Sequence, residues 1–110
     1  MFRTYGITGA SNPGGWLDAA MQRFAQARRI KRFCETKGLE LGGNSIVTTD
    51  TIYELNTAYN LFEWGWIDYV IITSMEVFSN SEDEKMMGII NYLINHNALI
   101  VIDEFRLFLV

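Results

Sequence analysis

The sequence predicts an α/β domain, a three-layer α/β/α sandwich around a mostly parallel sheet of about five strands. Segments of strand character alternate with segments of helical periodicity, and a strand ends the series. This order predicts the layered sandwich, with right-handed crossovers between its parallel strands. Two strand segments, 68–73 and 98–102, are apolar on successive residues, as parallel strands between two helical layers are. Because 49% of the 110 residues are hydrophobic and no stretch resembles a linker, we expect one domain over residues 1–110.

The first strand is expected at residues 2–8, a short run that stops at Gly9. The helix after it is predicted to begin with Asn12 as its N-cap and Pro13 in its first turn. Its apolar residues recur at steps of three and four and mark one face: Ala20, Phe24, Ala27, Ile30 and Cys34. Gly38 supplies the helix ending.

A second strand is expected in the β-branched run 46–49, formed there or continued from 39–41. Thr51 and Glu54 have the spacing of a capping box, in which each side chain bonds a backbone N–H of the first helical turn. The helix that this box opens should run to Gly65.

A further capping box, Ser81 with Glu84, opens a helix for which Asn97 is the expected C-cap. The buried strand at 98–102 comes next, and residues 105–110 follow it after only two residues. So short a link forbids a parallel crossover, so these last residues are predicted to form an antiparallel edge strand or an extended tail.

Composition excludes several function classes. The net charge of −4 and the pI of about 4.8 disfavour independent DNA binding, which depends on neutralising phosphates. The only basic cluster, 28–32, is interpreted as the solvated face of a helix. The single histidine, His96, rules out Ser-His-Asp and multi-histidine metal chemistry, so we expect neither a metal nor another cofactor.

The expected location is the cytoplasm. The single Cys34 has no partner for an internal disulfide, and no secretory signal opens the chain. No apolar run approaches the roughly 18 residues that a membrane span needs, so no membrane association is expected.

Three segments carry a family resemblance through their order and spacing: QARRIKRFCETKGLE at 26–40, WGWIDYVIITSMEVFSNS at 64–81 and INYLINHNALIVIDE at 90–104. They resemble the N-terminal catalytic domain of the serine recombinases, the resolvase and invertase family. The first is similar to that family's first long helix, the second to the strand that leads into its "LDRLSRS" catalytic segment, and the third to the end of its core sheet. Residues 5–9 lie where the family has "YxRxS".

The resemblance implies a serine that attacks the scissile phosphate and arginines that stabilise the transition state. In the ungapped register the serine is replaced by Gly9 and its neighbouring arginine by Ile7. The acid and two arginines of the catalytic segment fall on Glu76, Val77 and Asn80, so only the carboxylate remains. We therefore expect no recombination, and we expect the chain to lack the family's dimerisation helix and DNA-binding domain.

The leading hypothesis is a catalytically inactive resolvase-like protein that binds another protein, a recombinase or regulator of a phage or mobile element. The interface candidates are large apolar side chains near sheet edges or helix ends: Trp64, Trp66, Phe105 and Phe108. A homodimer through 105–110 is a further expectation.

Two alternatives from other classes stay open. A residual phosphoryl-transfer enzyme, nuclease or recombinase fragment would use Glu76 with a divalent metal, or Thr8 or Ser11 as a nucleophile with Arg3 as the nearby cation. Asp18, Asp68, Glu76, Asp103 and Glu104 are carboxylates that strand ends bring together in some folds, although surface solubility explains them more simply. The second alternative is a small-anion or nucleotide site at the turn before the first helix, with Ser11, Asn12, Gly14 and Gly15 as candidates.

Overall fold

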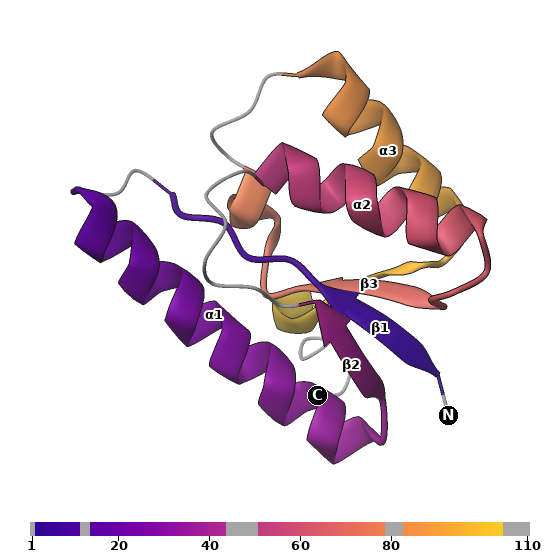
Figure 1. Cartoon of the computed structure of the whole chain (residues 1–110), viewed down its shortest axis with the longest axis horizontal. Coiled ribbons are helices and arrows are strands. Elements are labelled where there is room, and N and C mark those ends of the chain that lie inside the picture. Colours follow the sequence, from indigo (N-terminus) through magenta and orange to yellow (C-terminus); the bar gives the residue numbers. More distant parts are fainter. Residues whose placement is uncertain (1, 12–13, 44–50, 79–82, 105–110) are drawn as a thin grey trace.

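The computed structural model describes residues 2–11, 14–43, 51–78 and 83–104. Seven helices and strands follow one another in that part of the chain, with a 3₁₀ turn between the last two helices (Figure 1). In order they are β1 (Arg3–Gly6), α1 (Trp16–Lys37), β2 (Glu40–Gly43), α2 (Thr51–Glu63), β3 (Tyr69–Ile72), η1 (Met75–Phe78), α3 (Glu84–Asn95) and β4 (Leu99–Val101).

The described strands form one parallel sheet in the order β2-β1-β3-β4. In its register, Thr4 of β1 lies opposite Leu41 on one side and Tyr69 on the other. The predicted α/β sandwich is confirmed, with four described strands where about five were predicted. The expected edge strand at 105–110 and the run at 46–49 lie outside the described residues.

Helices cover both faces of the sheet (Figure 1). Ile71 points to the face under α1, where it packs with Ile30 and Cys34. Its neighbours Val70 and Ile72 point to the opposite face, into the larger core beneath α2 and α3. Since both faces of β3 are covered, successive residues of this strand are buried, which is why the sequence is apolar without alternation.

The buried face of α1 differs from the predicted one in its N-terminal half. Ala27, Ile30 and Cys34 are buried as expected, but the fourth buried residue is Arg23, whereas Phe24 is exposed. Beyond the strand ends, α1 lies beside the segment that follows β1 instead of over the sheet (Figure 1). Its packing partner there is polar backbone, so the apolar periodicity no longer marks the buried side.

The predicted caps were wrong in detail. The N-cap of α1 is Gly15, three residues after the predicted Asn12, and it has a φ of 155°. Thr51 is the first residue of α2 instead of its cap, and the Glu54 side chain turns away from the helix end to Tyr5. For α3, the cap is Asp83, whose side chain accepts a hydrogen bond from the backbone N–H of Lys85 at 2.8 Å.

The C-terminal end of α3 also shifts by one residue. The C-cap is His96, and Asn97, the predicted cap, follows it with a left-handed φ of 53°. Asparagine tolerates this conformation better than most residues do. The prediction that Asn97 takes part in ending the helix was therefore correct, but its assignment as the C-cap was wrong by one residue.

Candidate functional site

The carboxyl ends of β1 and β3 form the candidate site. In the sheet, β2 pairs with one edge of β1 and β3 pairs with the other edge. The connection after β1 and the connection after β2 therefore run in opposite directions across the sheet. Sheets of this kind bind ligands at such a switch point, beyond the carboxyl ends of the two strands. The segment after β1 and the η1 turn after β3 meet at this point, and these two segments hold most of the positions that the resemblance assigns to catalysis.

Gly9 is packed directly against the backbone of η1. A Cβ placed on Gly9 would lie 2.3 Å from the carbonyl oxygen of Val77 and 3.0 Å from the Thr51 hydroxyl. Real Cβ atoms do not approach backbone oxygen this closely, so only glycine fits unless η1 moves. The position that the resemblance gives to the nucleophile is closed to any side chain.

The other positions that the resemblance assigns to catalysis differ in exposure. Ile7 is completely buried and Val77 nearly so, and both belong to the core under α2 and α3. Glu76 is exposed on η1, with its backbone N–H bonded to the Ser74 hydroxyl at 3.3 Å. Asn80 lies outside the described residues. Two of the positions where the family has arginine therefore hold apolar core side chains.

Two glutamines of α1 hold the segment after β1. The carboxamide of Gln26 accepts from the N–H of Gly9 and donates to its carbonyl, both at 2.8 Å. One turn earlier, Gln22 pairs in the same way with Ser11, at 2.9 and 3.3 Å. Gln22 and Gln26 are four residues apart on a helix, which is about 6 Å along its axis. Gly9 and Ser11 are two residues apart in an extended segment, which is about 6.6 Å, so each glutamine lies beside its partner.

A buried polar cluster lies beneath this segment. Arg23 donates through Nη1 to the carbonyl of Thr8 at 3.2 Å, and the Tyr5 hydroxyl donates to the carboxylate of Glu54. Arg23 and Glu54 are both buried, on α1 and α2 respectively. The cluster thus connects both helical layers to the end of β1.

Burial and charge shift two pKa values in this cluster. Burial, together with the Glu54 carboxylate that accepts its hydrogen bond, raises the pKa of Tyr5 well above its ordinary value. Burial lowers the pKa of Arg23, and the negative charge of Glu54 opposes part of that change. Tyr5 therefore stays neutral and Glu54 keeps a donor throughout the physiological range.

The sequence patterns did not indicate the roles of Arg23 and Gln22 at this site, and they assigned Glu54 to a capping box instead. A signal for Arg23 was present, since it lies four residues before Ala27 on the buried face. A basic residue in an apolar stripe must find polar partners in the fold. The glutamines gave no such signal, because their partners are backbone groups.

At the turn before α1, two of the four anion candidates already have acceptors for their backbone amides. The Ser11 N–H donates to Gln22, and the Gly14 N–H donates to the Asp18 carboxylate at 2.9 Å. Gly15 is exposed and Asn12 lies outside the described residues. An anion bound at this turn would have to displace or tolerate the negative charge of Asp18.

The candidate carboxylates are placed at separate points. Asp68 accepts a hydrogen bond from the N–H of Arg3 at 2.9 Å, at the amino end of the sheet. Asp18 accepts one from the N–H of Gly14, and Asp103 forms an ion pair with Arg29 on α1. Within the described ranges, no three His, Cys, Asp or Glu side chains are grouped as metal ligands.

The two tryptophans of the predicted interface are exposed on a hydrogen-bonded turn at the end of α2. Trp64 is 68% and Trp66 64% exposed. Gly65, with a φ of 75°, donates to the carbonyl of Phe62 at 3.0 Å, and Trp66 donates to that of Leu61 at 2.9 Å, the pair of bonds of a Schellman ending. Phe105 and Phe108 lie outside the described residues.

Arg3 fixes this turn to the sheet. Its Nη2 donates to the Gly65 carbonyl at 2.7 Å, and its backbone N–H donates to Asp68. Both indoles are therefore presented outward from a backbone whose conformation is already set, so binding through them costs little ordering entropy.

Comparison of the chain with protein-family models, with curated proteins and with solved structures finds no match. Among the described residues, no helix combines the length and the hydropathy needed to cross a membrane.

Proposed function

We propose that this chain is a catalytically inactive resolvase-like protein that acts by binding another protein, a recombinase or a regulator of a phage or mobile element, in the cytoplasm. One observation carries the proposal: the Gly9 position, where the resemblance places the nucleophile, is filled by the Val77 carbonyl. A serine there would need room for Oγ beyond a Cβ that already overlaps backbone.

The remaining hydroxyls near the site do not restore the chemistry. Thr8 is 1% exposed, so its hydroxyl is shielded from a DNA phosphate. Ser11 is partly exposed, but Arg3, the nearby cation in the sequence, lies at the opposite end of β1 and bonds Gly65. Arg23, the cation that does lie at this segment, is buried and donates to the Thr8 carbonyl, so among the described residues no exposed cation faces the charge that develops during phosphoryl transfer.

The tryptophan turn supports the binding role. Tryptophan is enriched among the residues that dominate interface energies, and two exposed indoles on a preorganised turn form a compact anchor. A protein partner fits this surface better than nucleic acid does, because Arg3, the cation bonded to this turn, is engaged with Gly65 and Asp68.

The catalytic half of the proposal is tested with supercoiled plasmid that carries mobile-element DNA from the host. We expect neither relaxation nor cleavage, and no covalent protein–DNA adduct after denaturation. An adduct that disappears in Thr8→Val or Ser11→Ala would overturn the proposal. For the binding half, we expect a host protein to be captured by the wild-type chain and lost from a Trp64→Ala/Trp66→Ala variant.

A further inference from the structure

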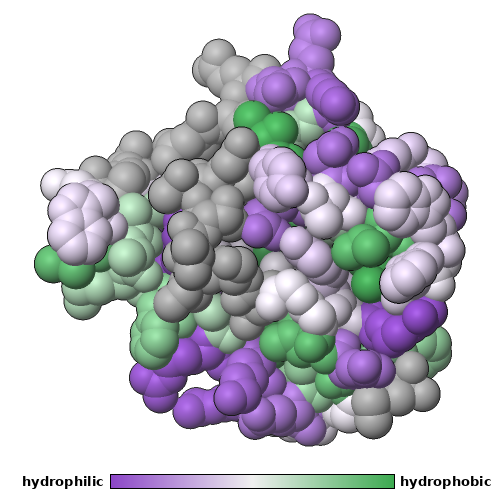
Figure 2. Space-filling view, viewed as in Figure 1, coloured by the Kyte–Doolittle hydropathy of each residue, from purple (hydrophilic) through white to green (hydrophobic). Residues whose placement is uncertain are grey.

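The N-terminal half of α1 exposes an apolar stripe that no described part of the chain covers. Leu17, Met21 and Phe24 follow at steps of four and three and are 57%, 64% and 51% exposed. Figure 2 shows apolar surface at this end of the helix, at the left of the view. Soluble proteins seldom leave such a stripe open, so its presence indicates an interface.

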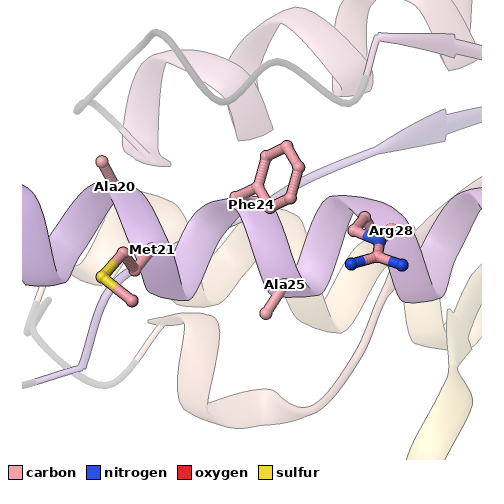
Figure 3. A pocket seen from close by; sticks show the side chains of 5 residues that line it. All are labelled: Ala20, Met21, Phe24, Ala25 and Arg28. Atoms are coloured by element: carbon pink, nitrogen blue, oxygen red, sulfur yellow. The ribbon is translucent and has the colours of Figure 1, made fainter.

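The spacing of the stripe suits a helical partner. A hollow of about 420 Å³ opens on the flank of α1 and is lined by Ala20, Met21, Phe24, Ala25 and Arg28 (Figure 3). Four of these lie at i, i+3, i+4 and i+7, beginning with Met21. Four residues with this spacing form the hole that receives one side chain of a facing helix.

We propose that a second copy of this chain covers the stripe, with the two α1 helices antiparallel. Leu17 of the second copy then inserts into the hole formed by residues 21, 24, 25 and 28. Met21 of the second copy inserts into the neighbouring hole, which is formed by residues 17, 20, 21 and 24. Both insertions require the same register, with the two-fold axis beside Met21. One stripe thus supplies both the knobs and the holes, as a symmetric interface requires.

Charge selects the antiparallel arrangement. Six of the nine Lys and Arg residues of the chain lie on α1, and five of the six fall between 28 and 37. Parallel pairing would set these groups side by side. In the antiparallel register the two Arg28 side chains are about 20 Å apart along the axis, beyond the Debye length of ~10 Å at 0.1 M salt. Each then lies just before the first turn of the other helix, the turn that carries Asp18.

The tail at 105–110 is a weaker occupant. The chain approaches it through Asp103, which pairs with Arg29. Around the axis of α1, Arg29 is about a third of a turn from the stripe, and the solvent-facing side of the helix lies between them. The tail would have to cross the helix before its first side chain reached the hollow, whereas a second copy meets the stripe directly.

The association should be weak. The three exposed side chains and their neighbours offer an area at the low end for specific interfaces, about 1,000 Å² for both copies together, so we expect dissociation in the micromolar range. Sedimentation velocity over a concentration series of the full chain should show a monomer–dimer equilibrium. Met21→Glu should raise the dissociation constant by about tenfold or more.

The matched control is Met87→Glu on α3, where the native methionine is 47% exposed on another helix. This variant should dimerise like the wild type. Cross-linking tests the register: Met21→Cys should form a dimeric disulfide with diamide, whereas Leu17→Cys, with its two copies about 11 Å apart along the axis, should not. Cys34 is buried and should not react.

A wild-type chain that stays monomeric at all concentrations would overturn the inference, as would an unchanged dimer in Met21→Glu. A dimer that survives Met21→Glu and disappears on truncation after Glu104 would assign the interface to the tail. These outcomes leave the proposed function untouched, because its anchor, Trp64 with Trp66, is at the end of α2.

Discussion

Replacing Gly9 with serine adds a side chain at the position that the resemblance gives to the nucleophile, and it should destabilise the fold. The added Cβ would lie 2.3 Å from the Val77 carbonyl oxygen, where ordinary contact begins at 3.4 Å, so η1 must move by about 1 Å. Overpacking of this kind costs roughly 1–3 kcal/mol. For a domain of this size, we expect Tm to fall by about 5–15 °C.

Thermal and urea unfolding followed by circular dichroism measure this effect. Gly14→Ser is the matched control, since it makes the same change in the same loop, and the nearest atom to its Cβ is 3.8 Å away. It should unfold like the wild type. If Gly9→Ser were as stable as Gly14→Ser, the position would have room for a side chain, and the argument for a closed nucleophile site would be refuted.

Three further predictions concern the groups beneath the site. Tyr5→Phe removes the donor to buried Glu54 and should cost about 1–3 kcal/mol in urea unfolding at pH 7. The raised pKa of Tyr5 should keep its stabilisation complete below about pH 10, the unfolded value, and lose it at higher pH; Tyr5→Phe should flatten this alkaline decline in Tm. Gln26→Ala removes both bonds to Gly9, so hydrogen exchange at the Gly9 amide should quicken in this variant and not in Gln22→Ala.

The α/β architecture was predictable because its signals are local. Successive apolar residues at 69–72 identify a strand covered on both faces, and the structure buries Ile71 on one side and Val70 and Ile72 on the other. The apolar steps Ala27, Ile30 and Cys34 found the buried face of α1 wherever that helix lies on the sheet. Where α1 lies beside the backbone after β1, the same periodicity misassigned Phe24.

The candidate site was predictable only in part, because its contacts join distant segments. The resemblance placed Gly9 at the nucleophile position, but nothing in the sequence showed that the Val77 carbonyl lies against it. The Tyr5–Glu54 bond spans 49 positions, and the local capping-box pattern assigned Glu54 to its own helix end instead. Local sequence patterns predict the wrong hydrogen bond for a side chain such as Glu54, which can bond either its own helix end or a distant residue.

Capture of a partner from the native host tests the central claim most directly. Tagged wild-type chain and the Trp64→Ala/Trp66→Ala variant would be expressed at equal levels, purified gently and compared by quantitative mass spectrometry, with Met87→Ala as a control for loss of another exposed apolar side chain. We predict that one host protein is retained by the wild type and by Met87→Ala and is depleted about tenfold or more from the double variant. Equal retention by all three chains, or capture of DNA in a covalent adduct in place of a protein, would contradict the account.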